Sequence, residues 1–119
     1  MLSDDAVTNG WAGHEATRVV ISHLGPSPDL RVLTVRGELD ISTSALLQRE
    51  LDGLLSAGTP RVEVDLSGVV FMDSSALSAL VAAHERAGAQ GQTLSLLSPS
   101  PACAKVLGIT GLDRVFNLI

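Results

Sequence analysis

Short stretches of alternating or β-branched apolar residues recur along the chain and predict β-strands. In residues 61–66, three aliphatic side chains alternate with Arg61, Glu63 and Asp65, which is the pattern of a strand with one buried face. The sequence Gly-Pro-Ser-Pro at residues 25–28 predicts a turn that joins the first two strands as a hairpin. The predicted strands are residues 17–21, 30–36, 61–66 and 93–98, and the tail, residues 112–119, has room for a short fifth strand.

Between these strands the apolar period changes to about 3.6 residues, which predicts amphipathic helices. Either Asp40 or Ser42 can cap the start of the first helix, and Gly58 ends it. The third helix has Ser100 as its N-cap and Pro101 at its first position. The predicted helices are residues 42–57, 74–87 and 100–108.

The order of these elements predicts an α/β fold. Strand, helix and strand between residues 61 and 98 form a βαβ unit with parallel strands and a right-handed crossover, and residues 67–72 connect its first strand to its helix. The simplest arrangement is a single domain with a mixed four- to five-stranded sheet and helices packed mainly on one face. Residues 1–16 show no clear period and are expected to form a loose N-terminal arm, so that residues 17–119 make up the domain.

Composition narrows the classes of function. A chain of 119 residues has room for one domain, and its net charge of −5, with only eight scattered Lys and Arg residues, argues against nucleic-acid binding. No apolar run approaches the roughly 18 residues of a membrane span, and the acidic N-terminus is unlike a secretory signal. We therefore expect a cytoplasmic protein without membrane insertion. The chain has one cysteine, Cys103, and no Cys/His cluster at ligand spacing. It therefore gives no sign of a disulfide, metal or cofactor.

The segment at residues 64–77 is the most informative part of the chain. An apolar strand runs out through Met72, and the small polar residues Asp73, Ser74 and Ser75 then open a helix. One interpretation is structural, because such side chains accept hydrogen bonds from unpaired N–H groups at a helix start. The other is functional: a hydroxyl here would be exposed at the positive end of the helix dipole, where an attached phosphate would be tolerated.

Three segments then point to a family. Phe71-Met72-Asp73-Ser74-Ser75-Ala76-Leu77 resembles the phosphorylation motif of the STAS domains of bacterial anti-sigma factor antagonists. Gly37-Glu38-Leu39-Asp40 resembles the family's Gly-Glu-Leu-Asp segment, and residues 98–113 resemble its serine-proline helix followed by Thr-Gly-Leu. The matches stand in order and cover residues 17–119.

The resemblance implies a partner-switching protein. The unphosphorylated domain would bind an anti-sigma factor that is also a serine kinase, which frees a sigma factor for transcription in a stress response. Phosphorylation of Ser74 would end binding, and a serine phosphatase would restore it. By position, the resemblance assigns Ser74 as the phosphoacceptor and places five residues in the partner-binding surface: Asp40, Met72, Asp73, Ser75 and Ala76.

Two other interpretations compete with this one. Ala76 stands where the family usually has glycine, and this favours a constitutive STAS interaction subunit of a larger assembly, such as a lipid-transport or stress complex. If the kinase backbone passes close to residue 76, the extra methyl would weaken phosphorylation. A hydrolase built on Ser74, Asp73 and His84 is disfavoured, because ten residues of helix separate Ser74 from His84 by roughly 15 Å. We therefore expect a binding protein that is not an enzyme, with His84 half-buried against the core.

Overall fold

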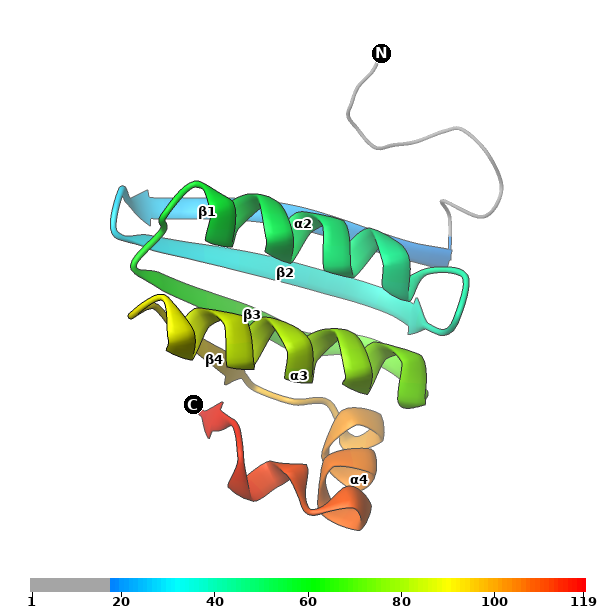
Figure 1. Cartoon of the computed structure of the whole chain (residues 1–119). Helices are drawn as coiled ribbons and strands as arrows, with labels where there is room; N and C mark the ends of the chain where they lie inside the picture. The colour runs from blue at the N-terminus through cyan, green and yellow to red at the C-terminus, as the bar shows by residue number, and fades with distance from the viewer. Residues whose placement is uncertain (1–17) are drawn as a thin grey trace.

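The computed structural model describes residues 18–119. The predicted N-terminal arm, residues 1–16, and the predicted domain boundary at residue 17 lie outside the described residues. The labels used below are those of Figure 1.

Five strands form one mixed sheet in the order β1-β2-β3-β4-β5. The first pair is an antiparallel hairpin, and all later pairs are parallel. The strands are β1 (Val19–Ser27), β2 (Leu30–Leu39), β3 (Arg61–Met72), β4 (Thr93–Leu97) and β5 (Asn117–Leu118). This confirms the predicted α/β fold, including the short fifth strand in the tail.

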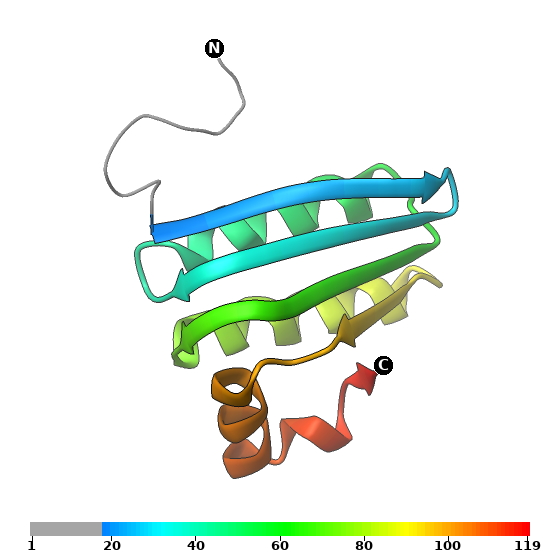
Figure 2. The ribbon, with the colours of Figure 1, turned by 180° about the vertical axis from the view of Figure 1, so that it is seen from behind.

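The helices α2 (Ser44–Ser56) and α3 (Ser74–Ala89) lie side by side across one face of the sheet (Figure 1). Seen from behind, the opposite face carries neither helix (Figure 2). The last helix, α4 (Pro101–Thr110), and a 3₁₀ turn, η2 (Leu112–Arg114), lie beside the β4–β5 edge. Helices packed mainly on one face are thus confirmed as well.

The core lies between the sheet and the two large helices. The leucine stripe of α2 is buried at Leu47, Leu51 and Leu55, as its spacing predicts. The aliphatic positions of residues 61–66 are also buried, while the charged ones alternate outward. Burial of these aliphatic side chains is the main stabilising contribution to the fold.

Several element boundaries differ from the predictions, and residues 67–72 differ most. They continue β3 instead of forming a connection, because they stay paired with β2 up to Leu39 and Met72 through two irregularities in register. Likewise, β1 continues through Gly25 and Pro26 to Ser27. Gly88 and Gly108 do not adopt a positive φ, and α3 and α4 pass through them. The stop of α4 is Gly111, whose φ of 76° is left-handed.

The extended strands bring two helix starts to one edge of the sheet. β2 leads into α2 and β3 leads into α3, and both helices begin at the same end of the molecule (Figure 1). The backbone N–H of Asp73 donates to the carbonyl of Leu39 at 3.1 Å. This bond joins the two loops at the edge where open α/β sheets usually carry their functional residues.

Candidate functional site

Asp73 is the N-cap of α3. Its backbone is extended, and its Oδ1 accepts hydrogen bonds from the backbone N–H of Ser75 at 2.9 Å and of Ala76 at 3.3 Å. The hydroxyl of Ser75 also donates to this oxygen. The structural interpretation of the Asp-Ser-Ser segment is therefore correct for Asp73, which satisfies two otherwise unpaired donors. The same bonds turn the Ser75 hydroxyl towards Asp73.

Ser74 occupies the first position of α3, and its side chain is exposed. The cap is thus supplied by the residue before it, which leaves the Ser74 hydroxyl outside the capping bonds. The first turn of a helix carries a partial positive charge from its N–H groups. Both features required by the functional interpretation, exposure and a place at the helix start, are present.

A second loop, residues 40–43, lies beside this helix start and is organised by Asp40. Its Oδ1 accepts from the N–H of Ser42 at 3.0 Å, from the N–H of Thr43 at 3.1 Å and from the Ser42 hydroxyl at 2.8 Å. The Ser42 hydroxyl, aided by the two amides, lowers the pKa of Asp40 to about 2. Asp40 is therefore a carboxylate at neutral pH. Helix α2 itself begins after Thr43, which makes no side-chain capping bond, so Asp40 organises the turn before the helix.

Exposed apolar side chains adjoin both loops in the sequence. Ile41, at the tip of the 40–43 loop, is 81% exposed, and Phe71, next to the end of β3, is 49% exposed. Val70 is also exposed. These exposed apolar side chains are therefore available for contact with another protein beside the two loops.

Two of the five predicted partner-binding residues have buried side chains. Met72 is only 4% exposed and Ala76 is fully buried, and both belong to the hydrophobic core. Met72 faces the helices with its strand partner Leu39, and Ala76 lies on the inward side of the first turn of α3. Neither side chain can contact a partner in this conformation. Asp40, Asp73 and Ser75 remain partly exposed.

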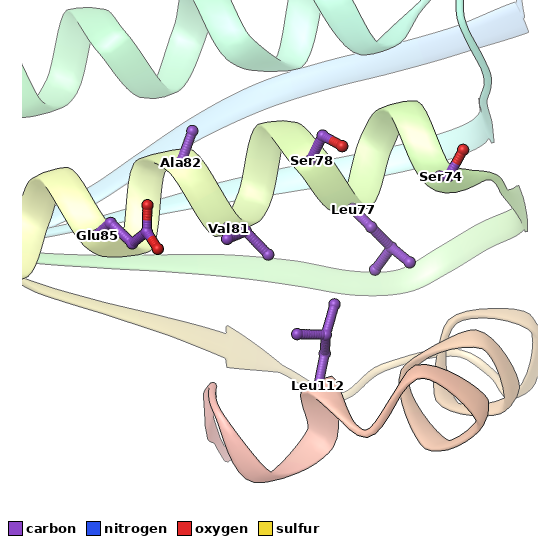
Figure 3. A pocket seen from close by; sticks show the side chains of 7 residues that line it. All are labelled: Ser74, Leu77, Ser78, Val81, Ala82, Glu85 and Leu112. Atoms are coloured by element: carbon purple, nitrogen blue, oxygen red, sulfur yellow. The ribbon is translucent and has the colours of Figure 1, made fainter.

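A shallow groove of about 400 Å³ runs along α3 from Ser74. Leu77 and Val81 point from the helix towards Leu112 of η2 and form its apolar floor, while Ser78 lies above them (Figure 3). Ser74 and Glu85 lie near its two ends (Figure 3). The sequence did not reveal this groove, because Leu112 comes from a distant segment and the helical period of Leu77 and Val81 indicates only core.

The other chemically notable residues do not converge on Ser74. The ring of His84 packs edge-on against Phe116 at 5.3 Å between centroids, which confirms a half-buried histidine. Cys103 is buried in α4, and burial raises the pKa of its thiol. Within residues 18–119, no group of three His, Cys, Asp or Glu residues is arranged to hold a metal ion. In the same residues, no helix is long and apolar enough to span a bilayer.

This geometry agrees with what comparison with known proteins finds. The family described as "Mlab, STAS domain" matches residues 22–119. The chain belongs to the STAS domain family. The match covers all of β2 to β5, including the 40–43 loop, the Ser74 helix start and the groove.

Individual STAS relatives carry one recurrent name. The anti-sigma-F factor antagonist RsfB of Mycobacterium tuberculosis is 28% identical over 86% of this chain and 80% of its own length. The anti-sigma-B factor antagonist of Staphylococcus epidermidis is 32% identical over 76% of this chain and 83% of its own length. The crystal structure of an anti-sigma factor antagonist from Mycobacterium paratuberculosis is similar with a TM-score of 0.76 and 25% identity, covering 91% of this chain and 89% of that one.

Proposed function

We propose that this STAS domain is an anti-sigma factor antagonist whose binding to an anti-sigma factor is switched off by phosphorylation of Ser74. The observation that carries the proposal is the exposed Ser74 hydroxyl at the first position of α3. Relatives named as antagonists of anti-sigma-F and anti-sigma-B factors support the class of partner. We call the 40–43 loop together with Asp73, Ser74 and Ser75 the docking surface.

The switch is a reversible phosphoryl transfer. The partner, a serine kinase, transfers the γ-phosphoryl group of ATP to the Ser74 oxygen, and ADP and the hydroxyl proton leave. A serine phosphatase hydrolyses the ester with water, which returns the hydroxyl and releases inorganic phosphate. The domain itself contributes the acceptor and the binding surface and is not an enzyme. We place this exchange in the cytoplasm, where ATP and the transcription machinery are found.

The charge of the phosphate explains why binding ends. A phosphoserine carries about −1.5 to −2 charges at neutral pH. At Ser74 that charge would lie next to the Asp73 carboxylate. The loop that carries the ionised Asp40 is also close, because the Leu39–Asp73 hydrogen bond joins it to this helix start. A partner surface that accommodates the two carboxylates would then meet a docking surface with much more negative charge. Electrostatic repulsion and the cost of desolvating the phosphate would oppose docking.

The alternative of a constitutive interaction subunit loses the residue that favoured it. Ala76 suggested a poorer fit to a kinase because its methyl could meet the kinase backbone. That methyl is fully buried in the domain, so it does not reach the surface that a kinase would approach. The phosphorylatable antagonist is therefore the function that we propose.

Intact-mass measurement tests the proposal. The protein is incubated with ATP and each purified anti-sigma factor kinase encoded in the same genome. One added phosphoryl group is expected with one of these kinases, none with Ser74→Ala, and one again with Ser78→Ala. Ser78 is a suitable control because it is an exposed serine one turn further along α3. An unmodified mass with all kinases, or equal modification of Ser74→Ala, would refute the assignment.

A further inference from the structure

Arg18, the residue just before β1, holds the docking surface from a distant part of the chain. Its Nε and Nη2 donate to Glu38 Oε1 at 3.3 and 3.0 Å, and its Nη1 donates to the Ser42 hydroxyl at 3.2 Å. Nη2 also forms an ion pair with Asp40 Oδ2. One guanidinium thus binds three side chains of residues 38–42, and planar guanidinium groups suit such multiple recognition.

The backbone is built to bring Arg18 this close. Gly37 pairs with Val19 and has a φ of +111°. A Cβ atom at residue 37 would lie 2.2 Å from the Arg18 carbonyl oxygen, which no other residue type would tolerate. The glycine that opens the family's Gly-Glu-Leu-Asp segment therefore allows Arg18 to lie against the strand that leads to Asp40.

Asp40 transmits the position of Arg18 to the loop. Its Oδ2 faces the Arg18 guanidinium, while its Oδ1 accepts the Ser42 and Thr43 amides that define the turn. The Asp40 carboxylate is thereby fixed from both sides. The loop it fixes presents Ile41, and β2, which leads into this loop, is bonded through Leu39 to Asp73 beside Ser74.

We propose that Arg18 is a positioning residue for the docking surface and so determines affinity for the anti-sigma factor, although none of the family motifs found in the sequence includes it. The effect on affinity rests on the proposed function, whereas the effect on the loop does not. Without the guanidinium, the Asp40 carboxylate keeps its bonds to the turn but loses its anchor to β1. The loop then samples other positions, and docking has to restore the one that the partner recognises.

Arg86 provides a matched control. It is 34% exposed against 38% for Arg18, and it likewise binds a carboxylate, Asp52, and a serine hydroxyl, Ser56. These contacts join the later parts of α2 and α3, away from the helix starts. Loss of either arginine removes an ion pair and a bond to a serine hydroxyl, but only Arg18→Met should disturb the docking surface.

The first measurement needs no partner. Amide hydrogen exchange of Ser42 and Thr43 is followed by NMR in wild type, Arg18→Met, Arg18→Lys and Arg86→Met. Loss of the guanidinium should speed exchange at these two amides about tenfold, because a loop without its anchor to Arg18 opens more often and each opening breaks the amides' bonds to Asp40. Arg18→Lys keeps the charge but not the multiple bonds, so it should increase the exchange rate by less. It also provides a folded variant if Arg18→Met does not fold. Unchanged loop exchange, or an equal effect of Arg86→Met, would overturn the proposal.

The second measurement concerns affinity. The dissociation constant is measured for the anti-sigma factor kinase that phosphorylates the wild-type protein. Arg18→Met should raise it about fivefold to tenfold and Arg86→Met should not. Faster loop exchange with unchanged affinity would overturn Arg18 as an affinity determinant. If the wild-type protein binds none of the kinases, the proposed function fails, while the exchange data still decide whether Arg18 positions the loop.

Discussion

At the scale of single residues, Ala76 shows how burial changes the meaning of a motif position. We expect Ala76→Gly to lower the free energy of unfolding by about 1–2 kcal/mol, because a buried methyl is lost and glycine is a poorer helix former. The rate of phosphorylation by the kinase should not change. Urea unfolding and a kinase time course measure the two effects.

Ala82→Gly is the control for this substitution, since Ala82 lies in the same helix but is exposed. It should show only the helix-propensity part, up to about 1 kcal/mol. A clear acceleration of phosphorylation by Ala76→Gly would mean that the methyl does obstruct the kinase, against its position in the core.

Asp40 makes a pH-dependent contribution to stability. Its pKa falls from 3.8 to about 2 on folding, so the native state binds this proton less readily than the unfolded chain. The stabilisation is therefore complete above pH 4 and is lost as the pH falls towards 2. We expect the difference in unfolding free energy between wild type and Asp40→Asn to shrink across this range. Urea unfolding at several pH values measures it, and a difference independent of pH would contradict the assignment.

At the scale of elements, the sequence predicted whatever is encoded locally. The helical period within residues 42–57, the alternation in residues 61–66 and the Ser100-Pro101 start of α4 each depend on residues close in sequence, and each is confirmed. For the candidate site, local chemistry likewise predicted the exposure of Ser74 and the cap at Asp73.

What the sequence missed depends on pairing between distant segments. Residues 67–72 were predicted to be a connection, because they form a strand only through their pairing with β2. The core positions of Met72 and Ala76 follow from that same extension of the strand and the helix start that it places. The Arg18 contacts and the groove at Leu112 join segments that have no shared pattern, so no local period indicated them.

The close approach of β1 to β2 at Gly37 predicts that a side chain at this position destabilises the sheet. Gly37→Ala combines a left-handed φ with a Cβ clash against backbone, so we expect a loss of about 2–4 kcal/mol in the free energy of unfolding. Gly53→Ala is the matched control, because Gly53 lies inside α2 and a Cβ atom added there would meet nothing within 4 Å. That control should be neutral or stabilising by up to about 1 kcal/mol. Thermal unfolding compares the stabilities of the two variants. Similar effects of both substitutions would show that the close approach of the strands at Gly37 does not require glycine.

In the molecule as a whole, the Ser74 side chain is separate from the core that keeps the domain folded. The core is sealed between the sheet and the inward faces of α2 and α3, whereas Ser74 lies at the outer end of one helix. A charge added there contacts solvent and the first turn, not the interior. The fold can therefore lose a partner without losing its own structure.

This separation predicts that phosphorylation changes affinity far more than stability. The phosphate gains from the N-terminal dipole of α3 and loses by repulsion from Asp73, so the two effects on the free energy of unfolding oppose each other. We expect the melting temperature of the Ser74 phosphoprotein to stay within about 4 °C of wild type, a change of under about 1 kcal/mol for a domain of this size. The dissociation constant for the anti-sigma factor should rise at least about tenfold, since a new charge must be desolvated at the interface.

Ser78→Asp, which places a charge on the same exposed helix face, should leave the dissociation constant within about threefold of wild type if repulsion is confined to the docking surface. Calorimetry of the modified and unmodified proteins, together with titration of the kinase, separates the two quantities, and a cooperative transition lost on phosphorylation would show that the switch acts by unfolding the domain.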